Sequence, residues 1–266
     1  MKSEQKYYES DTFWNPKNIK PGERERIIDT YKLIPKDVTS IADIGCGNGI
    51  FANYIVKKNK KIKVVGVDES ISALKYVNTQ KKEGNIISLP LKDQEFDLVA
   101  ALEVIEHLSV EDYRLAQKEL ARVSKKYILI SVPNNENLRS NFIECPECHS
   151  QFSRSFHKRS FNANVLNSLF VEDGFSCEYV KKLGQNREYF IISPIYRLIK
   201  RYLQRKHFNG VLICPVCNFT NDSSINDLGN KQVQNSFSFK LGKLIKLFWP
   251  SYTRYKWLVA LYVRRQ

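Results

Sequence analysis

A glycine-rich loop is the feature that most constrains how this 266-residue chain can fold. The segment Ser40–Ile44 has the β-branched and apolar character of a strand, and it runs directly into Gly45–Gly49. The next stretch, Ile50–Lys58, has the composition of a helix. Glycines at such a turn let the backbone approach a ligand closely, and the helix N-terminus offers free N–H groups to an anion. A strand, a glycine turn and a helix in this order are typical of parallel α/β folds.

The spacing of the glycines narrows the kind of ligand. A dinucleotide-binding fingerprint needs a third small residue at position 50, where this chain has Ile50. The spacing is therefore G-x-G-x-G, and nicotinamide binding is disfavoured. A second strand, Lys63–Val67, is followed by Asp68, about 20 residues past the loop. A carboxylate at this position can accept hydrogen bonds from both ribose hydroxyls of a nucleoside.

Short β-branched segments alternate with polar, helix-like stretches between residues 39 and 133, and the alternation resumes after residue 160. This rhythm predicts a mostly parallel sheet wrapped by helices. The remaining expected strands are Asn85–Ser88, Phe96–Leu102, Tyr127–Val132, Ser176–Leu183 and Trp257–Arg264. The remaining expected helices are Ser72–Gln80, Glu111–Val123 and Asn162–Glu172.

These elements divide the chain into six parts. We expect an N-terminal lid or helix at 1–38, a cofactor-binding Rossmann-like core at 39–133, a first insertion at 134–160, a core helix and strand at 161–185, a second insertion at 186–255 and the last core strand at 256–266. The first insertion is rich in Asn, Ser and Cys and is predicted to be an irregular loop. The first residues lack the apolar stretch of a targeting segment, and no apolar run approaches the roughly 20 residues that span a bilayer, so we expect a cytoplasmic protein.

Several motifs, in order and at matching spacing, resemble those of the class I S-adenosylmethionine-dependent methyltransferases of type 11. They are Ile41–Gly49, Val65–Asp68, Phe96–Val99 and Glu103–Leu108. The resemblance covers about residues 20–190 and the last strand. It implies an α/β fold with a mostly parallel Rossmann-like sheet, an antiparallel last strand, helices on both faces, and S-adenosylmethionine as the cofactor.

The resemblance also implies which residues hold the cofactor. The glycine loop would hold the methionine moiety, Asp68 the ribose and Asn85 with its neighbour the adenine. The family often has Asp at position 85, but an Asn carbonyl still accepts a hydrogen bond from the adenine amine. The expected cofactor-binding residues are Asp43, Gly45, Cys46, Gly47, Asn48, Gly49, Asp68, Glu69, Asn85, Ile86, Leu102 and Glu103.

Two histidines and two carboxylates are expected near the methyl group of the cofactor. Glu103, Glu106 and His107 follow the fourth strand, and His157 follows the fifth. The carboxyl ends of parallel strands meet at one edge of the sheet. Positioning supplies much of the rate of methyl transfer, and a hydroxyl acceptor must also lose its proton. We expect the histidines to act as bases and Glu106 to orient them.

Two other roles remain open for these residues. The set Glu103, Glu106, His107 and His157 is similar to that by which small-RNA ribose methyltransferases and some quinone-pathway O-methyltransferases bind a divalent cation. Oxygen ligands with imidazole suit Mg²⁺ or Mn²⁺. Alternatively, Glu106 and His107 only cap the following helix.

Four of the six cysteines lie in two Cys-Pro-x-Cys turns. Four thiolates make a closed tetrahedral set, as a structural Zn²⁺ requires. Disulfides or redox roles are disfavoured because each pair lies in a loop of a protein expected in a reducing compartment. Both connections should leave the carboxyl edge of the sheet, so zinc would tie two long loops into one lid over the site. The expected ligands are Cys145, Cys148, Cys214 and Cys217, whereas Cys46 and Cys177 are expected to be structural.

Positive charge is concentrated in the second half of the chain. The net charge is +14, of which residues 1–133 carry +3 and residues 134–266 carry +11. The second half is therefore expected to face an anionic partner. Segments 195–206 and 240–250 place basic side chains beside apolar stripes, which suits either an anionic membrane surface or a packed substrate lid. Basic and aromatic residues that suit nucleic acid are Arg154, Lys158, Arg159, Phe152, Phe156 and Phe161.

Methyltransferases with a Cys-Pro-x-Cys loop resemble, as a group, tailoring enzymes of bacterial glycan and lipid-linked saccharide pathways. We therefore expect O-methylation of a saccharide, a phosphate-bearing glycan or a lipid-linked sugar, with peripheral contact to the inner face of the membrane. The alternative is ribose 2′-O-methylation of RNA, and nucleic acid is the less favoured partner. A second alternative is a non-catalytic, zinc-stabilised binding protein.

Overall fold

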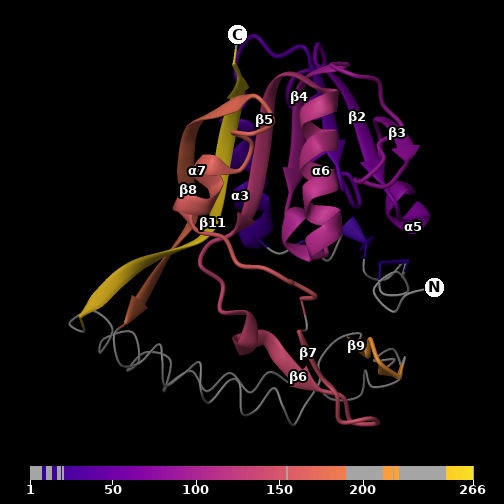
Figure 1. Ribbon diagram of the computed structural model, residues 1–266, viewed down its shortest axis with the longest axis vertical. Helices are drawn as coiled ribbons and strands as arrows, with labels where there is room; N and C mark the ends of the chain where they lie inside the picture. The colour runs from indigo at the N-terminus through magenta and orange to yellow at the C-terminus, as the bar shows by residue number, and fades with distance from the viewer. Residues whose placement is uncertain are drawn as a thin grey trace.

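A computed structural model describes residues 8–9, 14–16, 19, 21–153, 155–189, 212–217, 219–221 and 250–265. Among these residues, seven strands form one sheet in the order β3-β2-β1-β4-β5-β11-β8 (Figure 1). Neighbouring strands are parallel from β3 to β5, and β11 is antiparallel to both β5 and β8. This topology confirms the predicted Rossmann-like sheet with an antiparallel last strand.

The elements have the following bounds. The strands of the main sheet are β1 Ser40–Ile44, β2 Lys63–Asp68, β3 Gln80–Glu83, β4 Phe96–Leu102, β5 Ser124–Pro133, β8 Phe175–Tyr189 and β11 Ser251–Arg264. The helices are α3 Pro21–Tyr31, α4 Ile50–Lys58, α5 Ile71–Leu74, α6 Val110–Val123 and α7 Ala163–Ser168, with 3-10 turns η2 Ile105–His107 and η3 Leu138–Asn141. The remaining short strands are β6 Phe142–Glu144, β7 Gln151–Ser153, β9 Leu212–Ile213 and β10 Thr220–Asn221.

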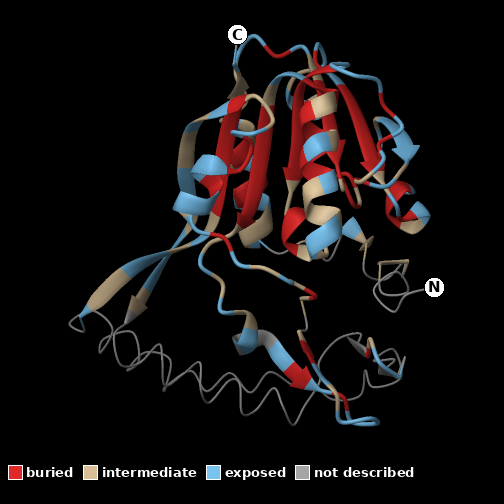
Figure 2. Ribbon diagram, in the orientation of Figure 1, coloured by how far each residue is buried: buried red, intermediate tan, exposed pale blue. Residues whose placement is uncertain are grey.

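Helices cover both faces of the sheet because successive side chains of a buried strand point to opposite sides. On one face, Ile44 packs in a core with Leu120 of α6 and with α7. On the other, Ile41 packs with Ile27 of α3 and Ile55 of α4. Figure 2 shows the central strands buried, while the outer sides of the helices are exposed. The two cores hold the sheet rigid, and the carboxyl ends of β1, β2, β4 and β5 open at one edge.

The first part of the sequence is predicted well except near its third strand. The expected strand Asn85–Ser88 is wrong, because those residues form only an isolated bridge and β3 lies at Gln80–Glu83. All four residues of β3 are exposed at the sheet edge, so the strand has no apolar pattern to reveal it. The expected helix Ser72–Gln80 is also too long, since α5 ends at Leu74.

Strands β8 and β11 are longer than the sequence predicts. They pair from Phe175 with Arg264 to Tyr189 with Ser251, and the two-stranded ribbon extends past the carboxyl edge of the sheet (Figure 1). The predicted strands cover only the apolar portions that pack in the core. The polar extension is held by pairing between the two strands, which leaves no apolar signal in either sequence.

The first insertion contains regular elements, contrary to the prediction of an irregular loop. Strands β6 and β7 pair as an antiparallel hairpin around the first Cys-Pro-x-Cys turn, and β9 and β10 do the same around the second. Both lie beyond the carboxyl edge of the main sheet (Figure 1). The basic segments 195–206 and 240–249, together with Arg154, lie outside the described residues. Within the described part of the chain, no helix is long and apolar enough to cross a membrane.

Candidate active site

The glycine loop forms a tight connection between β1 and α4. Gly45, Gly47 and Gly49 have φ values of 65°, 53° and 71°, a region that L side chains rarely adopt. A Cβ at Gly45 would lie 2.6 Å from Val104 Cγ2, so only glycine fits there. Cys46 is buried against Leu74 and Val77 beneath the loop. Burial raises the pKa of the Cys46 thiol, which fits its expected structural role.

Asp68 links the end of β2 to the glycine loop. Its Oδ2 accepts a hydrogen bond from Gly47 N at 2.7 Å, and its Oδ1 accepts one from Ser70 N at 2.9 Å. Burial raises the pKa of Asp68 despite these bonds. Burial also raises the pKa of the neighbouring Glu69, and the negative Asp68 adds to that shift. The Asp68 carboxylate stands beside the loop, where the sequence predicts the ribose site.

The expected adenine residues form the next turn along this edge. Asn85 Oδ1 accepts a hydrogen bond from Ile87 N at 2.9 Å, which fixes the turn. An amide oxygen has two lone pairs, so this bond leaves one for a ligand. Ile86 is buried in the core and gives the turn an apolar base. Gly84 N donates to Asp68 O at 3.0 Å and ties the turn to the ribose residue.

Buried polar atoms without hydrogen-bond partners in the described structure gather beside the loop. They include Asp43 Oδ2 at the end of β1, and Nε and Nη1 of Arg26 on α3. Burial raises the pKa of Asp43 to about 7; negative Asp68 raises it further, while a bond from the Ala52 backbone and positive Arg26 oppose the shift. A buried carboxylate and a buried guanidinium, each with unused hydrogen-bonding atoms, fit the ammonium and carboxylate of a methionine moiety.

Arg26 lies at the candidate site, although no sequence motif points to it. Its Nη1 lies 3.9 Å from Glu103 Oε1, and its side chain is 10% exposed. Glu103 has a φ of 60° at the end of β4, and its Oε1 accepts a hydrogen bond from Ser131 Oγ at 2.8 Å. Leu102, just before it, is partly buried against the core. The only available signal for Arg26 is an arginine next to the buried Ile27 on an otherwise amphipathic helix.

Three of the four residues expected near the methyl group come together. Potential ligand atoms of Glu106, His107 and His157 lie within 4.8 Å of one another. His157 Nε2 is 4.0 Å from Glu106 Oε1, and the two histidine rings are 4.6 Å apart, edge to face. Glu103 stands apart from this group, because it is engaged by Ser131 and Arg26.

Burial sets the charge of this cluster. Glu106 is fully buried, and neither of its carboxyl oxygens has a hydrogen-bond partner in the described structure. Burial, with a further contribution from Glu103, raises its pKa well above the usual range. Burial lowers the pKa of His107 to about 3, and positive His157 and Lys158 add to the effect. His107 is therefore uncharged near neutral pH, and burial favours the protonated form of Glu106.

His157 has a carboxylate partner that the sequence did not reveal. Its Nδ1 bonds to Glu136 Oε2, and its ring is 14% exposed. A carboxylate on Nδ1 fixes the tautomer with a proton there, which leaves Nε2 to accept a proton toward Glu106. This pairing is the arrangement of a general base with its orienting group.

The described N-terminal residues lie over the glycine loop. Trp14 packs closely on Gly47, and a Cβ added to Gly47 would lie 2.5 Å from the Trp14 ring. Asn48 Nδ2 donates to Trp14 O at 3.0 Å. The Tyr8 hydroxyl lies 3.4 Å from His107 Nδ1. Residues before α3 thus contact both the loop and the histidine cluster.

The four predicted zinc ligands meet at one point. Cys145 Sγ lies 3.6 Å from Cys217 Sγ, and Cys148 Sγ lies 3.6 Å from Cys214 Sγ. All four sulfurs lie within 4.8 Å of one another. A tetrahedral Zn–S bond of about 2.3 Å separates neighbouring sulfurs by about 3.8 Å, so the donor set and spacing fit a zinc ion. Cys177, the other expected structural thiol, lies on β8 and packs against the core.

An apolar cluster joins the cysteine hairpins to the histidine site. Phe156 packs with Phe152, Ile143 and the buried Cys145 and Cys214. Because His157 is the next residue, the position of its backbone depends on how this cluster packs.

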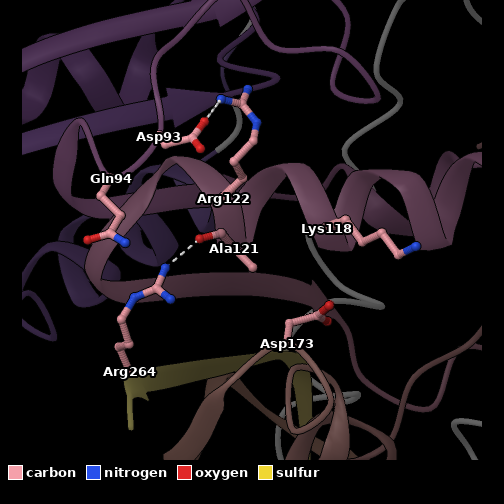
Figure 3. Close-up of a pocket in the computed structure, with 7 residues that line it drawn as sticks. All are labelled: Asp93, Gln94, Lys118, Ala121, Arg122, Asp173 and Arg264. Atoms are coloured by element: carbon pink, nitrogen blue, oxygen red, sulfur yellow. Dashed lines mark hydrogen bonds and ion pairs between the residues drawn. The ribbon is translucent and has the colours of Figure 1, made fainter. Parts of the chain in front are cut away.

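A polar pocket lies at the amino edge of the sheet, opposite the candidate active site (Figure 3). Its volume is about 290 Å³, and Arg122 and Arg264 contribute to its wall. Arg122 pairs with Glu119 and Asp93 at 2.6 and 2.7 Å. Arg264 Nη2 donates to the Ala121 and Ser124 carbonyl groups, both at 2.6 Å. These guanidinium groups bond to the protein itself.

Comparisons with known proteins agree with this geometry. Residues 42–129 match a family model described as "Methyltransferase domain". A Mycobacterium tuberculosis protein named "Probable S-adenosylmethionine-dependent methyltransferase" is 30% identical over 150 residues, which cover 54% of this chain and 52% of that protein. The chain thus spans about half the length of the curated relatives it matches.

Solved structures show the same fold. A S-adenosylmethionine-dependent methyltransferase from Archaeoglobus fulgidus has a TM-score of 0.53 at 17% identity, covering 98% of this chain and 97% of that one. A chain of the complex between a Haloferax volcanii methyltransferase and its activator Trm112 has a TM-score of 0.55 at 11% identity, covering 98% and 95%. The chain therefore shares the fold of these structures, its residues 42–129 match a methyltransferase domain, and it is similar to S-adenosylmethionine-dependent methyltransferases.

Proposed function

We propose that this protein transfers a methyl group from S-adenosylmethionine to a hydroxyl of a saccharide, a phosphate-bearing glycan or a lipid-linked sugar. The observation that carries the proposal is the carboxyl edge of the sheet. There, buried atoms of Asp43 and Arg26 that lack a hydrogen-bond partner in the described structure lie beside the glycine loop, and a histidine with a carboxylate partner lies at the same edge.

Arg26, Asp43 and Asp68 would hold the cofactor. The Arg26 guanidinium would bind the methionine carboxylate, the Asp43 carboxylate the ammonium, and Asp68 the ribose hydroxyls. Bound S-adenosylmethionine supplies an activated methyl group. The remaining task of the protein is to position the acceptor oxygen and remove its proton.

His157 would remove that proton. Nε2 accepts it, while Glu136 keeps the Nδ1 proton in place and stabilises the imidazolium that forms. The buried Glu106 and the uncharged His107 close one side of this site and exclude water from it. In this scheme His157 is the base, and His107 is a neutral neighbour because its pKa is far below neutral.

A divalent cation is the second candidate at this cluster. The compact set of one carboxyl group and two imidazoles favours it, since the Glu106 oxygens have no hydrogen-bond partner in the described structure. Mg²⁺ or Mn²⁺ there would activate the acceptor hydroxyl as a Lewis acid. Activity that survives EDTA treatment and does not rise with added Mn²⁺ would exclude this version and leave His157 as the base.

A structural Zn²⁺ would bind Cys145, Cys148, Cys214 and Cys217. Their sulfur spacing supports this role, and the site would hold the two hairpins together over the carboxyl edge. Elemental analysis of protein purified without chelator should find one zinc per chain. Cys214→Ser should lose the metal and unfold at a lower temperature, whereas Cys177→Ser should keep it. Equal zinc content in both variants would contradict the assignment.

The net charge of the chain bears on the chemical class of the methyl acceptor. The +14 net charge supports an anionic acceptor or one carried on an anionic membrane surface, at which a cytoplasmic protein would bind peripherally. RNA is the alternative because its backbone is also anionic. Its binding should fall steeply with salt, with a logarithmic slope near 0.7 per phosphate contact on a single strand.

Turnover with labelled S-adenosylmethionine tests the proposal. The acceptors are nucleotide sugars, sugar phosphates, polyprenyl-linked sugars and short RNAs, each offered with and without Mn²⁺. We expect label in a sugar-containing acceptor and in none of the RNAs. Transfer to RNA alone would support RNA methylation instead of glycan methylation. Failure to bind S-adenosylhomocysteine would contradict both methyltransferase hypotheses.

A further inference from the structure

A second pocket at the carboxyl edge lies next to the proposed base. Its volume is about 240 Å³, and it lies between the end of β5, the start of the first insertion and the β8–β11 ribbon. It is lined by Pro133, Asn134, Glu136, Asn186, Glu188, Arg254 and Lys256. Glu136 belongs to both places, because it lines the pocket and bonds to His157 Nδ1.

The walls of this pocket are fixed by hydrogen bonds. Asn134 donates from its backbone to Lys256 O at 2.8 Å and from Nδ2 to Tyr255 O at 3.0 Å. Glu188 accepts from the Tyr252 hydroxyl at 2.7 Å and pairs with Arg254 at 3.3 Å. These bonds lock the start of the insertion to the ribbon. The pocket therefore has a defined shape in the folded chain.

Trp257 places the pocket beside the cofactor residues as well. Lys256 Nζ lies 5.6 Å from the Trp257 ring centroid, and the Arg26 guanidinium lies 5.6 Å from the same centroid. One indole thus has a pocket lysine and the proposed carboxylate-binding arginine near it. The pocket thus adjoins the His157–Glu136 pair through Glu136, and its Lys256 shares the Trp257 ring with Arg26.

The lining has the chemistry of a carbohydrate site that accepts an anionic group. Amide and carboxylate side chains bind hydroxyls as donors and acceptors, and Asn134, Asn186 and Glu136 supply both. Lys256 supplies positive charge for a phosphate, and Arg254, which also pairs with Glu188, adds to it. No described residue that lines the pocket is aromatic, whereas proteins that read single-stranded RNA stack its bases on aromatic rings.

We propose that this pocket is the acceptor subsite, and that it binds a sugar phosphate with its hydroxyls on the asparagine and glutamate side chains and its phosphate on Lys256 and Arg254. The inference rests on the proposed methyltransferase function and specifies its acceptor class. It also gives the elongated β8–β11 ribbon a role, because the ribbon residues beyond the core form one wall of the subsite.

Amide hydrogen exchange on the full chain saturated with S-adenosylhomocysteine tests this subsite. The probes are glucose 6-phosphate, uncharged methyl glucoside and a uridine tetranucleotide. We expect glucose 6-phosphate to slow exchange around residues 133–136, 185–188 and 253–256. Methyl glucoside should need about tenfold higher concentration for the same effect, because it lacks the charged contact.

Two matched lysine variants provide the control. Lys256→Met should raise the half-saturating concentration of glucose 6-phosphate about tenfold, whereas Lys182→Met, on the same ribbon but outside the pocket, should leave it unchanged. Identical behaviour of the two variants, protection by the tetranucleotide instead of the sugar phosphate, or no protection by either sugar would overturn the inference. If S-adenosylhomocysteine still binds when one of these results is found, only the subsite proposal is contradicted. If S-adenosylhomocysteine does not bind, both the methyltransferase proposal and the subsite proposal are contradicted.

Discussion

The two edges of the central sheet differ in whether their buried and half-buried charged side chains have hydrogen-bond partners within the protein. At the amino edge, Arg122 and Arg264 direct their nitrogens to carboxylates and backbone carbonyls of neighbouring segments (Figure 3). At the carboxyl edge, Arg26, Asp43 and Glu106 are more deeply buried, yet several of their polar atoms have no hydrogen-bond partner among the described residues.

This difference separates structural charge from functional charge. An unpaired buried polar atom destabilises a fold by about 1–3 kcal/mol, so such atoms need an explanation where they gather. A ligand that supplies a carboxylate and an ammonium would satisfy Arg26 and Asp43 together. None of the described residues that line the amino-edge pocket has such an unsatisfied buried atom, and at the carboxyl edge these atoms lie beside the glycine loop and in the histidine cluster.

The largest expected effect is on catalysis at the carboxyl edge. His157→Gln should lower kcat by about 10²- to 10⁴-fold, the usual contribution of a general base. Affinity for S-adenosylhomocysteine should stay within about twofold of wild type, since His157 is not among the proposed cofactor contacts. The control is His149→Gln, which alters an exposed histidine on the first cysteine hairpin. Unchanged kcat in the His157 variant would remove the assigned base.

An arginine exchange tests the contrast between the edges most directly. Arg26→Met should weaken binding of S-adenosylhomocysteine by about 10- to 100-fold, because it removes a charge-assisted bond, and it should not lower the stability of the cofactor-free protein. Arg264→Met should do the reverse, with lower thermal stability and normal affinity. Calorimetric titration and thermal unfolding measure both. Loss of stability without loss of affinity in the Arg26 variant would contradict the assignment.

Asp43 gives cofactor binding a pH dependence. Its raised pKa of about 7 means that folding favours the protonated acid, so ionisation from about pH 4 to pH 7 destabilises the cofactor-free protein. The methionine ammonium favours the ionised form, so affinity for S-adenosylhomocysteine should rise by about three- to tenfold from pH 6 to pH 8. Asp43→Asn should flatten this dependence. A pH-independent affinity in the wild type would argue against contact between Asp43 and the ammonium.

The smallest effect is expected at the amino edge. Asp93 is 77% exposed and pairs with Arg122, which keeps Glu119 as a second partner. Asp93→Asn should therefore change the free energy of unfolding by no more than about 1 kcal/mol and leave turnover unchanged. A larger loss of activity would show that this pocket has a role beyond stability.

The sequence predicts the framework because each of its signals is local. The apolar strand Ser40–Ile44, the glycine loop and helix Ile50–Lys58 occur at the predicted residues, since alternation and turn chemistry act over a few neighbours. Strand β3 is missed because its exposed edge needs no apolar side chains. The ends of β8 and β11 are missed because pairing with a distant strand holds them.

The candidate site also contains residues that the sequence predicts and residues that it does not. Motif spacing predicts that Glu106, His107 and His157 lie together and that the four cysteines meet, and the structure has both clusters. Arg26 and Glu136 are missed because their roles depend on contacts with Glu103 and His157, which lie 77 and 21 residues away in the chain. No local pattern marks an arginine on a helix or a glutamate in a loop as part of a site. Only the packed fold shows these partners.

Calorimetric titration of the wild-type chain with S-adenosylhomocysteine tests most directly whether the carboxyl edge is a cofactor site. The unsatisfied buried charges predict one binding site per chain, and the affinity should fall in Arg26→Met but not in Arg264→Met. No binding heat at millimolar ligand, or equal weakening in the two variants, would contradict the account.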